Sequence, residues 1–341
     1  LFLGVSGVFF FWARIAIDKP VVEYYINESE SSLKNPAPKP PAHIETPSSV
    51  KGIYMTSWVA GVPDWRDDLM SLIDSTELNS IIIDVKDYTG RISFEVSDRV
   101  LMDIGASERR IPDVQELIKE LHNRNIYTIA RISVFQDPYL VKKRPDLAVK
   151  RKNGAVWKDY KGISWLDPAS VEVWQYTVRI AKEAERVGFD ELNFDYVRFP
   201  SDGNMDDISY PFSNITSTSS KSEILERFFI YLNRQLDDLP IPISADLFGL
   251  TTWHKDDLNI GQILEKAAPH FDYICPMVYP SHYPEGFNGY KNPAKYPYEI
   301  IYSGLARAKE RLESMPGYHL CNSQQKRNAN ITQKPNTSSS S

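Results

Sequence analysis

The chain has 341 residues, of which 42% are hydrophobic and 12% aromatic, enough for one large α/β domain or two ordinary ones. Its 39 Lys and Arg and 45 Asp and Glu residues give a net charge of -6 with no long basic stripe, which argues against nucleic acid as a partner. Cys275 and Cys321 lie far apart, without a CxxC pair or a Cys/His cluster. We therefore expect neither a disulfide framework nor a structural zinc site.

The first 50 residues predict an export signal followed by a tether. Residues 1–17 (LFLGVSGVFFFWARIAI) are almost entirely apolar, and we expect a signal peptide or membrane anchor there. Residues 18–50 are rich in Pro, Ser, Glu and Lys, a composition that predicts an extended linker without a packed core. The domain that follows is expected outside the cytoplasmic membrane, anchored or secreted, with the N-terminal segment as its only membrane contact.

From residue 51 onward, short apolar runs alternate with segments of helical period, a pattern typical of parallel βαβ units. We expect strands at residues 52–58, 80–87, 126–133, 189–199, 241–248 and 271–279. Helices are expected at residues 64–75, from Pro112 onward, at 170–187, around 224–236 and at 297–314. Asp64 is the expected N-cap of the first helix, and Gly188 is expected to end the third.

Six βα units are recognised, whereas a closed barrel of this type needs eight. Residues 51–314 therefore predict an α/β fold of the (β/α)8 TIM type that is incomplete. An open sheet is the alternative, but the sixth unit ends abruptly, which favours a shortened or altered barrel. Residues 315–341 are polar, end in SSSS and predict a disordered tail.

Two acidic residues are the main catalytic candidates. Ligands of parallel α/β folds bind at the carboxyl ends of the strands. Alternation puts Asn193, Asp195 and Val197 on one face of the fourth strand, and Asp246 can point inward at the same height from the fifth. Glycoside hydrolysis uses two carboxyl groups within several ångströms, one ionised and one protonated. We expect Asp195 as nucleophile or electrostatic stabiliser and Asp246 as general acid/base.

Other polar and aromatic residues near the strand ends are candidates for binding a sugar, because charged groups orient hydroxyls and aromatic rings stack on sugar rings. They are Trp58, Asp84, Lys86, Asp87, Arg131, Trp165, Tyr196, Arg198 and Tyr279. A purely structural role is the alternative: Asp195 would pair with Arg198 or Arg131, and Asp246 would cap the next helix. The joint placement of the two acids favours the functional interpretation.

The sequence contains no phosphate-cradling glycine loop and no ligand set with metal spacing, so we expect no cofactor and no metal. Ser57 and Ser244 lack a His partner and no GxSxG motif occurs, which disfavours a serine hydrolase. A metal-dependent hydrolase would need His ligands that the strand ends lack. The alternative function that stays open is a non-catalytic carbohydrate-binding or cell-wall scaffold module, which would bind glycans with the same aromatic residues at the strand ends. The pattern specifies neither the glycan nor the oligomeric state.

Several stretches between residues 51 and 313 together resemble one bacterial family. They are IIIDVKDYTG, ARISVFQD, WKDYKGISWLDP, GFDELNFDYVRFP, ISADLFG and CPMVYPSHY. The chain is similar to a family assigned to the glycoside hydrolases and once labelled only as a domain of unknown function. The resemblance implies a TIM-type barrel, a polysaccharide substrate and catalytic roles for the acids at the mouth, above all Asp195 and Asp246. The chain departs from the family pattern after about Met315.

Overall fold

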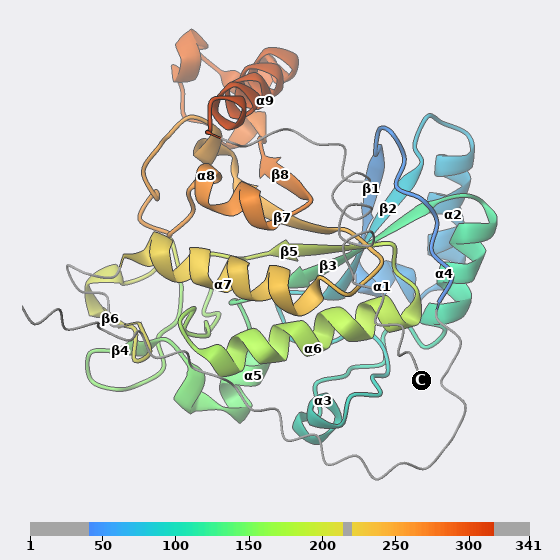
Figure 1. The fold of residues 1–341 in the computed structure, drawn as a ribbon, viewed down its shortest axis with the longest axis horizontal. Coiled ribbons are helices and arrows are strands. Elements are labelled where there is room, and N and C mark those ends of the chain that lie inside the picture. The colour runs from blue at the N-terminus through green and yellow to red at the C-terminus, as the bar shows by residue number, and fades with distance from the viewer. Residues whose placement is uncertain (1–40, 214–219, 317–341) are drawn as a thin grey trace, which may run out of the picture. The chain divides into compact units, whose positions relative to one another are not determined.

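The computed structural model describes residues 41–213 and 220–316. Within them, parallel strands form one curled sheet in the order β1-β2-β3-β5-β7-β8 (Figure 1). These strands are β1 (Gly52–Met55), β2 (Ser80–Lys86), β3 (Tyr127–Ser133), β5 (Glu191–Asp195), β7 (Ile243–Phe248) and β8 (Tyr273–Met277). The predicted α/β fold, an incomplete TIM-type barrel with six strands, is confirmed. A short antiparallel ribbon joins β4 (Lys150–Arg151) to β6 (Ile208–Ser209).

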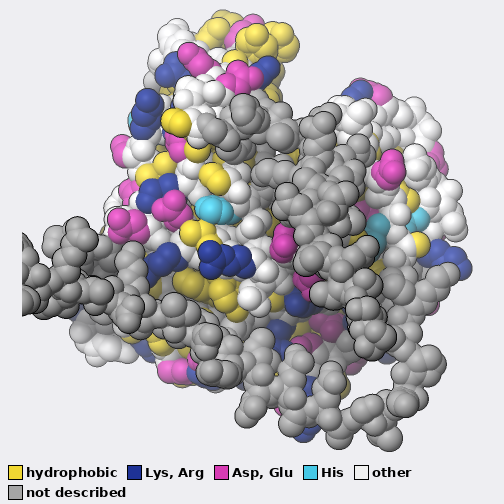
Figure 2. Space-filling model, viewed as in Figure 1, with side chains coloured by type: hydrophobic (Ala, Val, Ile, Leu, Met, Phe, Trp, Pro, Cys, Tyr) yellow, Lys and Arg dark blue, Asp and Glu magenta, His cyan; other side chains and the backbone are white. Residues whose placement is uncertain are grey.

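Helices connect the strands and cover the outer face of the sheet, where α6 and α7 run alongside each other (Figure 1). The longer helices are α2 (Pro63–Asp74), α4 (Val114–Asn123), α6 (Val171–Val187), α7 (Lys221–Leu236) and α9 (Pro297–Glu313). The shorter ones are α1 (Ser57–Ala60), α3 (Arg99–Ile104), α5 (Pro138–Lys143) and α8 (Leu264–Ala267). Hydrophobic side chains gather on the outward face of α9, where Tyr298, Ile301, Tyr302 and Leu305 are exposed (Figure 2).

Local chemistry explains where two of these helices begin and end. Gly188 follows α6 with φ of 112°, a left-handed conformation that glycine adopts without steric cost, as the sequence predicts. A capping box starts α7, since the Ser220 hydroxyl accepts from the Glu223 amide and the Glu223 carboxylate accepts from the Ser220 amide. Both devices satisfy backbone groups that a helix end leaves without partners.

Two predicted helix starts are wrong by one or two residues. Val62 rather than Asp64 is the N-cap of α2, and Asp64 lies in the first turn, where its charge favours the positive end of the helix. The next helix, α4, begins at Val114 after the N-cap Asp113 rather than at Pro112. The apolar stripe predicted for α4 is buried nevertheless, because its period does not depend on the terminal residue.

The sequence overestimates the length of two strands that lead into the site. The first strand ends at Met55, since the Thr56 hydroxyl accepts from the Val59 amide and starts the short helix α1, which contains Ser57 and Trp58. The fourth ends at Asp195, because Tyr196 has φ of 53° and leaves the extended conformation. Both strands therefore turn sharply at the end where ligands bind in this fold.

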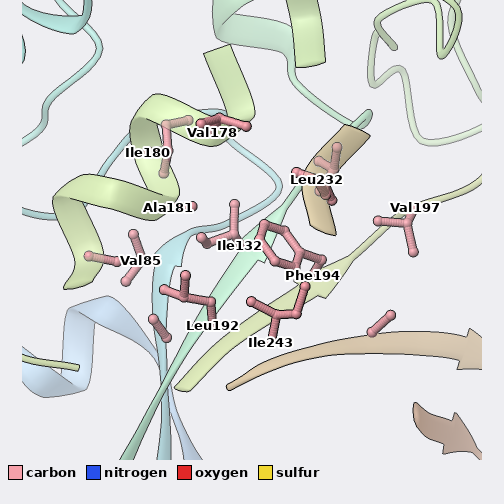
Figure 3. Close-up of a cluster of buried hydrophobic side chains, with 14 of the residues drawn as sticks. Val85, Ile132, Val178, Ile180, Ala181, Leu192, Phe194, Val197, Leu232 and Ile243 are labelled. Atoms are coloured by element: carbon pink, nitrogen blue, oxygen red, sulfur yellow. The ribbon is translucent and has the colours of Figure 1, made fainter. Parts of the chain in front are cut away.

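The hydrophobic core lies between the sheet and helices α6 and α7 (Figure 3). In β5, Leu192 and Phe194 point into this core, as do Ile132 of β3 and Ile243 of β7. Because successive strand residues point to opposite faces, Asn193 and Asp195 of β5 face the inner side of the curled sheet. The period-two pattern of the sequence thus holds along β5 as far as Asp195.

Some predicted segments lie outside the described residues: the signal or anchor at 1–17, most of the linker at 18–50, and all but the start of the tail at 315–341. The last part of the predicted linker contacts the barrel. The Ile44 amide donates to Asp190 at 3.0 Å, and the hydroxyls of Thr46 and Tyr127 are 3.0 Å apart. No helix within residues 41–213 and 220–316 is long and apolar enough to span a membrane.

Candidate active site

Asp195 and Asp246 end neighbouring strands in register. Strands β5 and β7 pair Phe194 with Ala245, and the next residue along each strand is the aspartate. Neighbouring strands lie about 4.8 Å apart, and residues in register point to the same face. The structure thus brings together the two acids that the sequence selects, on the inner side of the sheet.

Arg131 of β3 holds Asp195 in place. Its guanidinium forms one ion pair with Asp195 and a second, at 2.7 Å, with Asp84 of β2, which also accepts a hydrogen bond from the Tyr54 hydroxyl. Burial by itself would lower the pKa of Arg131, but the charges of Asp195 and Asp84 outweigh it and raise that pKa. The Asp195–Arg131 pair that the structural alternative foresees is therefore present, although Asp195 still lines a cavity.

Asp246 lies in a different environment. It is half-buried and accepts a hydrogen bond from Asn193 Nδ2 at 3.0 Å, and it has no ion pair among the described residues. Burial, followed by the nearby charge of Asp195, raises the pKa of Asp246 to about 7. Below about pH 7, a protonated Asp246 thus stands beside a carboxyl group that is ion-paired with Arg131, an arrangement that suits acid-catalysed cleavage of an acetal.

A third carboxyl, Glu191, lies beneath this pair and was not selected from the sequence. The Ser244 hydroxyl donates to Glu191 at 2.6 Å, and Asn193 Nδ2 lies 3.2 Å from the same hydroxyl oxygen. Burial raises the pKa of Glu191 to about 7. Hydrogen bonds therefore connect Glu191 through Ser244 and Asn193 to Asp246. The available sequence signal was the alternation that places Glu191 on the same face as Asn193.

A cavity of about 300 Å³ opens beside Asp195, and we call it the mouth cavity. Its walls come from the ends of β5, β7 and β8 and the loops after them. The lining residues are Asp195, Tyr196, Arg198, Phe248, Gly249, Leu250, Met277, Tyr279, His282 and Tyr283. Three residues predicted to bind substrate, Tyr196, Arg198 and Tyr279, are thus brought together with the predicted catalytic Asp195, whereas the other predicted catalytic residue, Asp246, is not among the lining residues.

The residues after β5 do not follow the alternation expected from the sequence. Strict alternation would put Val197 on the face of Asp195 and place Tyr196 and Arg198 on the opposite one. Instead, Tyr196 and Arg198 line the mouth cavity and Val197 is buried in the hydrophobic core. The left-handed turn at Tyr196 is the physical reason, since it ends the extended backbone on which the period of two depends.

Two predicted residues, Trp58 and Asp87, belong to a separate group at the ends of β1 and β2. Trp58 is 57% exposed, and its ring centroid is 4.4 Å from the guanidinium carbon of Arg110. Arg110 in turn forms an ion pair with Asp87 at 2.7 Å, and Asp87 also accepts from the Thr89 amide. Neither Trp58 nor Asp87 lines the mouth cavity.

Trp165 and Lys86 are buried beside the site rather than open to it. Trp165 is 1% exposed, donates to Asp159 at 3.0 Å and packs edge-on against Tyr196, so it supports the cavity wall from behind. Lys86 is equally buried and forms an ion pair with the fully buried Asp137 at 2.9 Å. Within the part of the chain that the structure describes, no three His, Cys, Asp or Glu side chains are grouped to hold a metal.

A curled parallel sheet with paired carboxyl groups and a cavity at the carboxyl ends of its strands is the arrangement of a barrel glycoside hydrolase. Residues 52–330 match the model of a family described as "Putative glycosyl hydrolase domain", so the chain belongs to that family. This membership confirms the family resemblance seen in the sequence, and with it the hydrolase class. No curated protein sequence matches the chain significantly.

Solved structures agree with this fold. A hypothetical protein from Ruminiclostridium thermocellum is 34% identical, with a TM-score of 0.52, over 61% of this chain and 98% of its own. The glycoside hydrolase domain of PgaB (BpsB) from Bordetella bronchiseptica has a TM-score of 0.55 over 76% of this chain and 81% of its own. Its sequence identity is 14%, so this second likeness shows the fold alone.

The burial of Lys86 with Asp137 predicts a stabilising role. We expect Lys86→Met to lower the free energy of unfolding by about 3–5 kcal/mol, because it leaves a buried carboxylate without its partner. The double variant Lys86→Met/Asp137→Asn should recover part of that loss. Urea unfolding followed by circular dichroism measures both. A Lys86→Met protein that is as stable as the wild type but inactive would instead place Lys86 in substrate binding.

The raised pKa of Asp246 predicts a pH-dependent cost to stability. An aspartate in the unfolded chain ionises near pH 4, whereas Asp246 in the folded protein ionises near pH 7. The folded state thus binds more protons between these values, and stability falls as the pH rises through that window. We expect Asp246→Asn, which can keep the hydrogen bond from Asn193, to raise the melting temperature at pH 8 but not at pH 4. A shift of equal size at both pH values would contradict the assigned pKa.

Proposed function

We propose that this protein hydrolyses O-glycosidic bonds of an extracellular or cell-surface polysaccharide by a two-carboxylate mechanism. The observation that carries the proposal is the unlike state of two neighbouring acids, with Asp195 ion-paired and Asp246 protonated up to about pH 7. Family membership supports the class of reaction, and the apolar N-terminal run followed by a Pro-rich stretch supports the location.

In this mechanism, Asp246 donates its proton to the glycosidic oxygen as the bond to the anomeric carbon breaks. The Asp195 carboxylate stabilises the positive charge that develops on the sugar ring, or attacks the anomeric carbon. Asp246, now ionised, takes a proton from the water that completes hydrolysis. Arg131 acts as a positioning residue, because its two ion pairs hold Asp195 and Asp84 at fixed places.

The sugar would enter through the mouth cavity. Tyr279 is 51% exposed and lines the cavity together with Tyr196, so both rings offer apolar faces against which a sugar can stack. Asp84 does not line the cavity, but Tyr54 and Arg131 hold it, and Arg131 also pairs with the cavity residue Asp195. We propose that Asp84 and Arg131 orient sugar hydroxyls.

Replacing either aspartate should abolish most of the activity. We expect Asp195→Asn and Asp246→Asn each to lower kcat by at least about 100-fold, since each removes one charge state that the reaction needs. The measurement is release of reducing ends from a panel of polysaccharides. Asp113→Asn is the control, because Asp113 also pairs with an arginine, Arg66, but lies outside the mouth cavity.

Unchanged turnover in both aspartate variants would contradict the proposed roles. A wild-type protein that binds glycans without releasing reducing ends would instead be the non-catalytic carbohydrate-binding module. Circular dichroism spectra of the variants should match that of the wild type. This match excludes misfolding as the cause of lost activity.

The pKa of Asp246 also predicts the alkaline limb of activity. A general acid works only when protonated, so kcat/KM should fall about tenfold per pH unit above about pH 7. Asp246→Asn should lose this limb, and its activity should recover partly with aryl glycosides, whose leaving groups depart without protonation. A wild-type kcat/KM that stays constant up to pH 9 would contradict Asp246 as the acid.

A further inference from the structure

Arg198 is a buried cation in the wall of the mouth cavity. It is 8% exposed, and its guanidinium carbon lies 4.7 Å from the ring centroid of Phe248, 4.9 Å from that of Trp165 and 5.2 Å from that of Tyr196. Three aromatic rings therefore surround the charge and exclude water from much of it. Asp195 and Arg198 line the same cavity.

The hydrogen bonds of Arg198 leave its charge without an acidic partner. Its Nη1 donates to the Phe199 carbonyl and to the Ser201 hydroxyl, both at 3.1 Å. Among the described residues, no carboxylate lies within ion-pair distance of it. Both of these acceptors are neutral, so they fix the direction of the guanidinium without neutralising it.

Two other arginines have the same exposed fraction as Arg198, and both have a charged partner. Arg66 and Arg110 are also 8% exposed, and each forms an ion pair at 2.7 Å, with Asp113 and Asp87 respectively. Burial of an unpaired charge costs several kcal/mol, and aromatic rings offset only part of that cost. Burial lowers the pKa of Arg198, and the more distant carboxylates do not restore it. Within residues 41–213 and 220–316, Arg198 thus differs from Arg66 and Arg110 in lacking a counter-ion.

We infer that the counter-ion is supplied by the substrate, so that the mouth cavity takes a sugar with an anionic group. This inference rests on the proposed hydrolysis, because Arg198 lines the same cavity as Asp195. A guanidinium offers paired N–H donors that match the oxygens of an anion. The carboxylate of a uronic acid, a sulfate ester and a phosphate ester share this chemistry. Arg198 is then the residue that selects acidic glycans over neutral ones.

The test compares acidic and neutral forms of the same sugar. Calorimetry measures the binding of D-glucuronate, glucose 6-sulfate, glucose 6-phosphate and D-glucose. Comparing their affinities shows which of the three anionic groups the site prefers. Hydrolysis of uronate-containing polysaccharides is compared with that of their carboxyl-reduced forms. We expect the wild type to favour the acidic form by about 10- to 100-fold, the range for a hydrogen-bonded charge pair. Arg198→Gln should abolish that preference, because it removes the charge and so lowers binding and hydrolysis of the acidic form far more than those of the neutral form.

Two further variants test whether the preference for acidic sugars depends on the positive charge at position 198. Arg198→Lys keeps the positive charge and should retain part of the preference. Arg307→Met is the matched control, because Arg307 also stacks on an aromatic ring, Trp253, at 4.6 Å but is exposed and outside the mouth cavity. It should leave the preference unchanged.

The inference is overturned if the wild type treats acidic and neutral forms alike, or if Arg198→Gln weakens both equally. These results differ from failure of the proposed function. Anion-dependent binding without release of reducing ends from any glycan would refute hydrolysis and keep the role of Arg198. Hydrolysis of neutral and acidic glycans at equal rates would keep the enzyme and refute the acidic substrate.

Discussion

The bridge that Arg131 forms between Asp84 and Asp195 is the interaction on which the candidate site depends. One guanidinium from β3 ties the carboxyl ends of three neighbouring strands, β2, β3 and β5, on the inner side of the curled sheet. It neutralises one of the two carboxylates that it contacts and holds Asp195 at the edge of the mouth cavity. Without that cation, two acids from strands β2 and β5 would face a third, Asp246, with nothing to offset their repulsion.

The same bridge explains why Asp195 and Asp246 differ. Asp195 takes the ion pair with Arg131, whereas Asp246 has a neutral donor, Asn193, and the negative charge of Asp195 nearby. Two chemically identical side chains thereby lie in different electrostatic environments, one beside a cation and the other beside an anion. This asymmetry makes a division of labour between an acid and a carboxylate possible in a site whose described part shows no grouping of metal-binding side chains.

Charged residues near the strand ends fall into two kinds, and burial with a partner separates them. Lys86 and Asp87 are buried against Asp137 and Arg110, so their charges are already satisfied within the protein. Arg198 is almost as buried, has no such partner in the part of the chain that the structure describes, and lines the cavity. Sequence position alone gives these residues equal standing, since all follow or end a strand. Only the folded chain reveals which of these charges is paired and which lines the cavity.

The sequence by itself determined the parallel six-strand order of elements, the core face of β5 and the pair of acids at neighbouring strand ends, because period and burial are local properties of each strand. Tertiary structure alone decided three things. The left-handed conformation of Tyr196 places Tyr196 and Arg198 in the cavity wall. The helix that starts at Thr56 places Trp58 outside it. Lys86 and Arg131 form ion pairs with residues distant in the sequence. Ion pairs join residues far apart in the chain, and a helix cap or a left-handed non-glycine residue interrupts the period of two, so the strand pattern by itself did not predict them.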